Sequence, residues 1–273
     1  MNQDEHIINN VERFSGFQSE YNRYRPTPPH LVVELLTKYL GTTPLCIVDL
    51  GCGTGLSTFI WKDSTNQIIG VEPNDDMRRQ AEEMLSQSDD ADHISFVKGY
   101  SNQLDIASGT IDIVTCSQSF HWMDPISTLN VVNRILRAGG IFAAYDCDWP
   151  PTVNWEIEDK YIRLIDMVEA FILKHAKKET LVKKWAKDEH LKNLKDSKAF
   201  RFTKEIVFHS REKCDSERYF GLAISQGGLQ TILKSGWTDL NEDIEQFRKI
   251  VENYFGQQTL DIVFSYRMRI GIK

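Results

Sequence analysis

The sequence predicts an α/β fold with a mostly parallel sheet at its centre, and two patterns support this prediction. Short apolar runs such as Leu45 to Leu50 and Gln67 to Val71 end in glycine-rich or polar turns, as buried parallel strands do. Other stretches, such as Ile126 to Leu136, repeat their apolar residues at helical spacing. Strands that alternate with helices are typical of a doubly wound sheet. A chain of 273 residues is long enough for one such domain with an elaboration.

The first predicted strand runs directly into a glycine-rich turn, within Ile47 to Gly55. The glycines permit positive φ angles and lack the Cβ atoms that would keep a ligand away from the backbone. They are Gly51, Gly53 and Gly55, and Asp49 precedes them. Leu56 to Trp61 is expected to start a helix whose free N–H groups face the same place. The turn therefore predicts a site for a nucleotide-like ligand.

An acidic residue, Glu72, ends the second predicted strand, about twenty residues after the turn. A carboxylate there can accept two hydrogen bonds from a ribose diol. Dinucleotide-binding folds use the same device, so an NAD-dependent oxidoreductase is an alternative. Their glycine pattern is G-x-G-x-x-G, whereas Leu56 stands here in place of the third glycine. The carboxylate of Asp49 also suits a cationic ligand better than a pyrophosphate.

Further segments extend the pattern along the chain. A predicted strand at 93–97 leads into a loop with Ser101 and Asn102, and one at 110–116 leads into Ser117 to Trp122. A glycine pair at 139–140 then precedes a fifth strand. At these segments and at the glycine turn, the chain resembles the class I S-adenosylmethionine-dependent methyltransferases. The resemblance covers about residues 17 to 145.

The resemblance implies a Rossmann-like, doubly wound sheet of seven strands, mostly parallel, with an antiparallel last strand. Runs at 202–209 and 260–270 supply the last two strands. Between them and the fifth strand, residues 150–199 have helical apolar spacing and many lysines, and we expect them to form a helical cap that acts as a substrate lid. The expected cofactor-binding domain then comprises residues 1–149 and 200–273.

The segment from Phe17 to Pro26 narrows the resemblance. A short helix there that closes over the site, together with Phe120 to Trp122, is similar to the group of small-molecule enzymes around trans-aconitate methyltransferase. The resemblance implies S-adenosyl-L-methionine as cofactor, with Arg25 paired to its carboxylate. The residues expected to bind it are Tyr21, Arg25, Asp49, Gly51, Gly53, Gly55, Glu72, Pro73, Met77, Ser101, Asn102, Ser117 and Gln118.

The methyl acceptor is expected next to the 117–122 loop. Trp122, Tyr145 and Trp149 are the expected walls of its pocket, although each residue could equally belong to the core. His121 has a suitable intrinsic pKa for a general base. A base is useful for a phenol, amine or thiol acceptor but is not needed for a carboxylate. His121 between two aromatic residues could instead have a packing or hydrogen-bonding role.

Composition limits the remaining possibilities. A net charge of −7 argues against a nucleic-acid partner, which usually requires a basic surface. The chain has neither an apolar run long enough for a membrane span nor a secretory signal, so we expect a cytoplasmic protein, as a monomer or homodimer. The five cysteines are widely spaced and predict buried thiols rather than a metal site. The lysine run in 174–198 is most simply a solvated helix face.

The sequence therefore predicts a methyltransferase acting on a small molecule, with carboxylic acids among the candidate acceptors. Two alternatives stay open. One is the NAD-dependent oxidoreductase, and the other is a non-catalytic module that binds the cofactor and acts through a protein partner.

Overall fold

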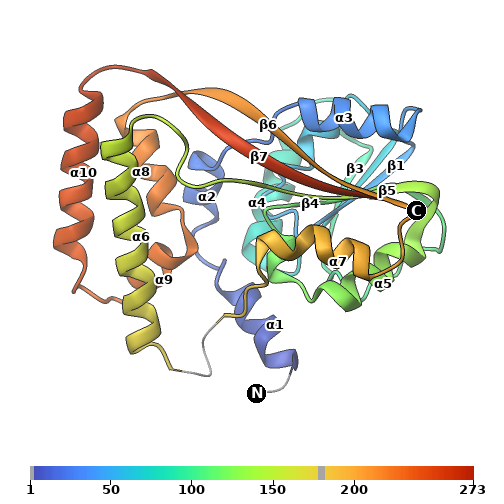
Figure 1. Cartoon of the computed structure of the whole chain (residues 1–273), viewed down its shortest axis with the longest axis horizontal. Coiled ribbons are helices and arrows are strands. Elements are labelled where there is room, and N and C mark those ends of the chain that lie inside the picture. Colours follow the sequence, from blue (N-terminus) through green and yellow to red (C-terminus); the bar gives the residue numbers. More distant parts are fainter. Residues whose placement is uncertain (1–2, 178–181) are drawn as a thin grey trace.

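The computed structural model describes residues 3–177 and 182–273 and contains a seven-stranded sheet (Figure 1). The strand order is β3-β2-β1-β4-β5-β7-β6. The first five strands are parallel, and β7 is antiparallel to both of its neighbours. This topology confirms the predicted fold class. The strands are β1 (Cys46–Leu50), β2 (Gln67–Val71), β3 (Ile94–Val97), β4 (Ile111–Ser117), β5 (Leu136–Cys147), β6 (Phe202–Cys214) and β7 (Leu260–Ile272).

The strand order reverses at β1, which pairs with β2 on one side and β4 on the other. Loops that leave the carboxyl ends of β1 and β4 therefore diverge to opposite sides and leave a crevice between them. In open α/β sheets ligands bind in this crevice. The glycine turn follows β1 and the 117–122 segment follows β4, so both lie at its rim.

Both faces of the sheet are covered, which explains the continuous apolar runs of its central strands. Ile47 and Val48 are adjacent in β1, face opposite sides and are both fully buried. Helix α3 (Leu31–Leu40) packs over one side of the sheet, whereas α5 (Pro125–Ile135) and α7 (His190–Asp196) pack over the other. Helix α4 (Asp75–Ser86) packs beside β3.

A separate layer of helices stands beside the sheet, on the left of Figure 1. It consists of α6 (Trp155–His175), α8 (Ser216–Ile224), α9 (Gly227–Lys234) and α10 (Asn241–Phe255), which pack against one another. This grouping differs from the expected cap of residues 150–199. Helix α7 packs on the sheet and is not part of this layer. The three helices that follow β6 join the layer, because their apolar faces are buried inside it.

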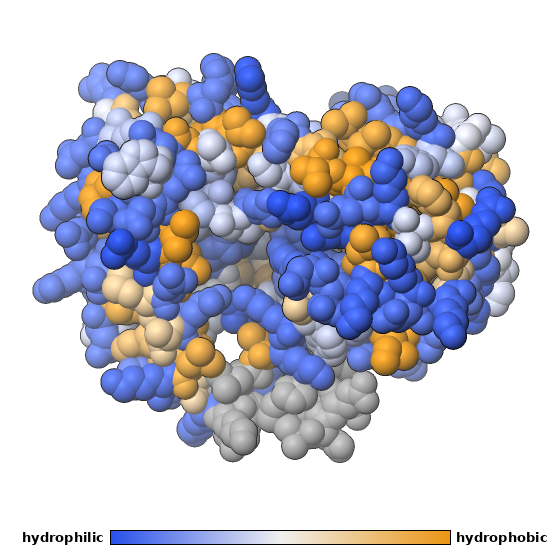
Figure 2. Space-filling model, in the orientation of Figure 1, coloured by the Kyte–Doolittle hydropathy of each residue, from blue (hydrophilic) through white to orange (hydrophobic). Residues whose placement is uncertain are grey.

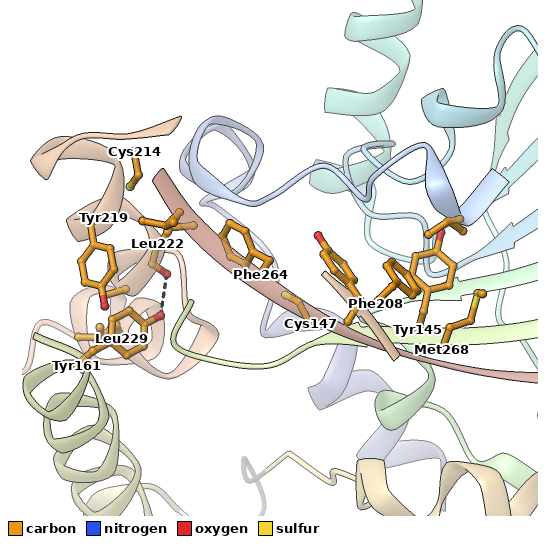
Figure 3. Packing of buried hydrophobic residues seen from close by; sticks show 14 of the residues in the cluster. Tyr145, Cys147, Tyr161, Phe208, Cys214, Tyr219, Leu222, Leu229, Phe264 and Met268 are labelled. Carbon is orange, nitrogen blue, oxygen red and sulfur yellow. Dashed lines mark hydrogen bonds between the residues drawn. The ribbon is translucent and has the colours of Figure 1, made fainter. Parts of the chain in front are cut away.

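One hydrophobic core connects the helical layer with the sheet. Figure 3 shows Tyr161, Tyr219 and Leu222 of the layer, with the Tyr161 hydroxyl donating to the Leu222 carbonyl at 3.2 Å. The same cluster continues through Phe264 of β7 to Tyr145 of β5. The long antiparallel pair of β6 and β7 extends from one part to the other and carries this core (Figure 1). The layer is therefore fixed to the sheet by packing.

Short elements complete the site. Helices α1 (Gln3–Glu12) and α2 (Gln18–Tyr24) precede α3, and the described residues include the 3₁₀ helices η1 (Phe59–Trp61), η2 (Phe120–Trp122) and η4 (Lys187–Glu189). The helix expected at 56–61 is thus only the single turn η1. No helix among the described residues is long and apolar enough to cross a bilayer.

Candidate functional site

A cleft opens at the carboxyl ends of β1, β2 and β4, with an empty volume of about 860 Å³ including its open mouth. We call it the edge cleft. It lies where the sequence predicts the cofactor. Its lining includes Gly51, Gly53, Glu72, Pro73, Met77, Ser101, Asn102, Ser117, Gln118 and Tyr21, together with Asn10, Val11 and Phe14 from the N-terminal segment. The structure therefore brings most of the expected cofactor residues to one place.

The residues of the glycine turn adopt a left-handed backbone conformation, which glycine adopts more easily than other residues. Gly51, Gly53 and Gly55 have φ angles of 63°, 57° and 89°. A Cβ atom on Gly51 would lie 2.8 Å from Ser119 Cβ, closer than real Cβ atoms come. The Ser119 hydroxyl donates to the Leu50 carbonyl at 2.7 Å, which ties the loop after β4 to the end of β1. Gly55 itself does not line the cleft.

Asp49 lies beneath the turn, outside the lining of the cleft, and is fully buried. Its Oδ2 accepts hydrogen bonds from the hydroxyls of Ser57 (2.6 Å) and Thr58 (2.8 Å), and its Oδ1 accepts one from Thr115 (2.8 Å). Burial raises the pKa of Asp49, against the effect of these hydrogen bonds. In this arrangement Asp49 fastens β1, β4 and the segment after the glycine turn together.

Glu72 lines the cleft and orients the turn. Its Oε2 accepts the Gly53 N–H at 2.9 Å, and its Oε1 accepts the Asn74 N–H at 2.8 Å. Each oxygen keeps a further lone pair for a ligand. Burial raises the pKa of Glu72 to about 7, although the two backbone hydrogen bonds oppose this. A pair of ligand hydroxyls would therefore meet an acceptor that is fixed in position and poorly solvated.

These features fit S-adenosylmethionine. Glu72 suits the ribose diol, and Ser101 and Asn102 suit the adenine end. The glycine turn is followed by the single turn η1 and not by the α-helix on whose N-terminus dinucleotide-binding folds hold a pyrophosphate. This favours a cofactor without phosphate.

A second cavity adjoins the edge cleft and has an empty volume of about 1200 Å³, again including its mouth. We call it the arginine cavity. It lies between the sheet edge and the helical layer, where Figure 2 shows the surface hollowed between the two parts. The two cavities share Phe14, Tyr21, Gln118 and Trp122. Other lining residues are Arg13, Arg25, His121, Trp149, Glu169, Lys184, Trp185, Lys187, Gln226, Gly227 and Gly228.

Two arginines give this cavity its name. The Arg25 guanidinium carbon lies 5.1 Å from the centre of the Tyr21 ring and 4.7 Å from that of Trp149, and its Nη2 donates to the Ser225 carbonyl (2.9 Å) and to Gln226 Oε1 (3.1 Å). Its buried Nε has no hydrogen-bond partner among the described residues. Arg25 lines the arginine cavity and also a smaller pocket beside Gly51 and Ser117, so the predicted pairing of Arg25 with the cofactor carboxylate stays a prediction.

Arg13 lies against the start of α9 and over Trp122, with 5.4 Å between its guanidinium carbon and the ring centre. A Cβ atom on Gly227 would come within 2.4 Å of Arg13 Nε, so any larger residue there would displace the Arg13 side chain. That Nε is buried and unpaired within the described part of the chain. Burial lowers the pKa of Arg13 to about 10, partly opposed by Glu169. Neither arginine has a carboxylate within ion-pair distance in the described residues.

Residues 182–189, which we call the strap, cover the cavity. Lys183 N–H donates to Asn10 Oδ1, and Asn10 Nδ2 donates to the carbonyls of Lys183 and Trp122, all at 2.9 Å. Trp185 N–H donates to the His121 carbonyl at 2.9 Å. Lys187 Nζ lies 2.9 Å from Asp146 Oδ1 and donates to Gln118 Oε1 at 3.2 Å. The strap is thus bonded to α1, η2 and β5.

Behind the lining of the arginine cavity, His121 and His190 flank the buried carboxylate of Asp146. One ring nitrogen of each histidine and one carboxylate oxygen lie within 4.8 Å of one another. This trio resembles a metal-ligand set. However, Lys187 Nζ and Arg269 Nη1 lie 2.9 and 3.5 Å from the same carboxylate. A divalent cation would stand beside two positive charges in a poorly solvated place, which is unfavourable. The trio is better described as a charge-balanced cluster.

Some predicted residues lie elsewhere, and some site residues were not predicted. Tyr145 is in the core at 1% exposure and does not line either cavity, because its side chain points to the α3 face of the sheet. Arg13 and Asn10 lie in a segment with no recognisable motif. The sequence did contain a signal for Asp146. This residue lies at the end of β5, and the neighbouring strand β4 ends close to His121. Parallel strands end at a common edge of the sheet, so the two residues lie at the same edge.

Comparison with known proteins identifies the fold and the domain. Residues 48–144 match a family described as a methyltransferase domain. A probable S-adenosylmethionine-dependent methyltransferase of Saccharomyces cerevisiae is 30% identical over 142 residues, which cover 51% of this chain and 49% of the yeast protein. A protein of Dictyostelium discoideum that is assigned to the methyltransferases is 22% identical over 129 residues, which cover 47% of this chain and 46% of that protein. The chain thus spans about half the length of the curated relatives it matches.

Solved structures agree on the fold. A protein from Anaeromyxobacter dehalogenans, assigned to the methyltransferases, superposes with a TM-score of 0.64 at 15% identity and covers 91% of this chain and 98% of its own. The YcgJ protein of Bacillus subtilis gives 0.54 at 16% identity, covering 90% and 99%. The solved structures therefore show a Rossmann-like fold, within which residues 48–144 match a methyltransferase domain. Both comparisons favour a methyltransferase over the alternative of an NAD-dependent oxidoreductase.

Proposed function

We propose that the protein transfers a methyl group from S-adenosylmethionine to a small organic acid held in the arginine cavity. The observation that carries the proposal is the junction of the two cavities at Tyr21, Gln118 and Trp122. A cofactor in the edge cleft and an acceptor in the arginine cavity would come into contact at these three residues. The arginine cavity, closed by the strap and the helical layer, is large enough for a small molecule.

The charge of the arginine cavity supports an acid as acceptor. Arg13, Arg25, Lys184 and Lys187 line it, and Glu169 is the one carboxylate in that lining. Buried guanidinium groups without a counter-ion are costly, and a substrate carboxylate would supply the missing charge in a planar, bidentate arrangement. The similarity to the trans-aconitate group remains part of this proposal.

The residues of the chain would act mainly by positioning. When bound, the cofactor supplies an electrophilic methyl group on a sulfonium. Glu72 and the glycine turn would hold its nucleoside, while Arg25 and Arg13 would hold the acid. The aromatic walls Tyr21, Trp122 and Trp149 would exclude water. Holding two reactants in line in a dry site supplies most of the rate enhancement that such a displacement needs.

Calorimetry with S-adenosylhomocysteine tests the cofactor site, and absence of binding at millimolar ligand would refute it. Formation of S-adenosylhomocysteine from S-adenosylmethionine over a panel of mono-, di- and tricarboxylic acids then tests the acceptor class. Methylation of neutral amines or alcohols alone would contradict the choice of an acid. Cofactor binding with no turnover of any acceptor would favour the non-catalytic module.

A further inference from the structure

His121 stands between the arginine cavity and the buried carboxylate of Asp146. Its Nδ1 is a buried atom, 3.4 Å from Asp146 Oδ1, while the ring also lines the cavity. The backbone around it is fixed, because its carbonyl accepts the Trp185 N–H and its ring leans on Trp122 at a centroid distance of 4.9 Å. The edge of the imidazole opposite Nδ1 therefore belongs to the cavity.

The carboxylate of Asp146 is strongly held in its ionised form. Burial acts to raise its pKa, but the nearby His121 and the charge of Lys187 outweigh burial and keep the pKa of Asp146 well below its usual value. Arg269, which also pairs with Glu205 at 2.8 Å, adds a second cation. An ionised carboxylate can only accept hydrogen bonds, so in any hydrogen bond between Asp146 and His121 the imidazole is the donor.

This fixes the protonation of the imidazole. Burial lowers the pKa of His121, and Lys187 and Lys184 act in the same direction, while Asp146 opposes them. A neutral ring beside an ionised carboxylate carries its hydrogen on Nδ1, so the lone pair is on Nε2. Behind the ring lies His190, whose pKa burial lowers to about 4, so it is neutral near pH 7. The charged groups across the cavity are Arg13, Arg25 and Glu169.

We propose that His121 is a general base, positioned by Asp146, that takes the proton of a hydroxyl group on the acceptor. The inference rests on the proposed function and extends it: the substrate is a hydroxy acid whose carboxylate is held by Arg13 and Arg25 and whose hydroxyl oxygen is methylated. As the O–CH3 bond forms and the S–CH3 bond breaks, the O–H proton moves to His121 Nε2. The electron pair of the broken bond stays on the neutral thioether that leaves.

A carboxylate acceptor would need no base, so the identity of the product separates the two cases. Hydroxy acids such as 4-hydroxyphenylacetate are assayed beside their parent acids, here phenylacetate, and the products are treated with mild alkali. Methyl ethers survive this treatment and methyl esters do not. The inference expects ethers from the hydroxy acids and much slower turnover of the parent acids. Esters alone, or no turnover of any hydroxy acid, would overturn it.

The variant His121→Gln tests the role of the imidazole. Loss of a general base costs about 10²- to 10⁴-fold in rate. The remaining rate should rise about tenfold per pH unit toward the pKa of the phenol, near 10, because only the ionised acceptor then reacts. The wild type should instead reach a plateau near neutral pH. His30→Gln, at the exposed residue that precedes α3, is the matched control. Equal rates and equal pH profiles for wild type and His121→Gln would contradict the inference.

A measurement on the protein alone decides the tautomer. Long-range ¹H–¹⁵N correlation of histidine-labelled protein, with the His121 signal identified by its loss in His121→Gln, should show the neutral form with hydrogen on Nδ1 at pH 7 to 8. Hydrogen on Nε2 would overturn the inference even if an acceptor is methylated. Failure to bind S-adenosylhomocysteine would instead refute the proposed function, so the two failures can be told apart.

Discussion

The edge cleft and the arginine cavity share a wall but are built in different ways. The centre of the edge cleft is the glycine turn and Glu72, where backbone groups and short-range contacts at the ends of β1 and β2 set its shape. The arginine cavity is lined by residues from the turn after α1, from α2, η2 and α6, and from the strap and the start of α9. The first is therefore set mainly by the sheet, whereas the second depends on packing between segments that are distant in the sequence.

The strongest test of a backbone-built cleft is to add a single methyl group to it. Gly51→Ala places a Cβ 2.8 Å from Ser119 Cβ at a φ of 63°. We expect a loss of about 2 to 4 kcal/mol in the free energy of unfolding. We also expect S-adenosylhomocysteine binding to weaken by about a hundredfold or more, which corresponds to about 2.7 kcal/mol, because the turn must shift. Chemical denaturation and calorimetry measure the two effects.

Gly41→Ala is the matched control, since Gly41 has a φ of 78° but open space around it. It should cost about 1 kcal/mol in stability and leave cofactor binding unchanged. Similar binding losses in both variants would mean that backbone strain, and not the shape of the cleft, is being measured.

Glu72→Ala removes the one carboxylate that lines the edge cleft close to the glycine turn. We expect cofactor binding to weaken by about 1 to 3 kcal/mol, the usual cost of losing charged hydrogen bonds. Glu34→Ala, on an exposed face of α3, should change nothing. An unaltered dissociation constant for Glu72→Ala would show that the ribose diol does not bind there.

Arg25→Met should separate the two cavities. It keeps an apolar side chain between Tyr21 and Trp149 but removes the guanidinium, so the KM for an acid should rise about tenfold while cofactor affinity stays the same. Arg23→Met, an exposed neighbour on α2 paired with Glu217, is the control. If Arg25→Met weakens cofactor binding instead, Arg25 pairs with the cofactor carboxylate, as the sequence predicts.

Cofactor binding should also depend on pH through Glu72. Its pKa of about 7 in the free protein means that below pH 7 the carboxyl must lose a proton before it accepts two hydroxyl groups. Affinity should therefore rise about tenfold between pH 6 and 8, and Glu72→Gln should flatten this dependence.

The folding stability of the free protein should change in the opposite direction and fall as the pH rises. A raised pKa favours folding below pH 4.5, and this contribution is lost as the pH rises through 7.

The smallest effect on binding is expected for Asp49→Asn. Asp49 holds three hydroxyl groups beneath the turn, so its replacement should cost about 1 to 3 kcal/mol in stability. Cofactor affinity should change by less than about threefold, or about 0.6 kcal/mol. A loss of more than tenfold in a variant that remains folded would restore Asp49 as a direct ligand contact.

The difference between the edge cleft and the arginine cavity also explains which parts of the site could be predicted from the sequence. The strands, the glycine turn and Glu72 are specified by neighbouring residues, and parallel strands bring their carboxyl ends together, so the edge cleft is predictable. The arginine cavity depends on how α6 and α9 pack against a segment more than a hundred residues earlier. Arg13 is an ordinary basic residue until Gly227 allows it to lie against α9. The expected cap of residues 150–199 differs from the observed layer for the same reason.

The position of β7 has a consequence for the way the chain folds. It pairs with β5 on one side and β6 on the other, and its partners in β5 lie more than a hundred positions earlier (Figure 1). Until β7 has been synthesised, the outer edge of β5 has no partner. Long-range pairing of this kind slows folding and leaves strand edges open to wrong association. Removal of β7 should therefore yield an aggregating chain and not a smaller enzyme, although the whole edge cleft lies in residues that precede it.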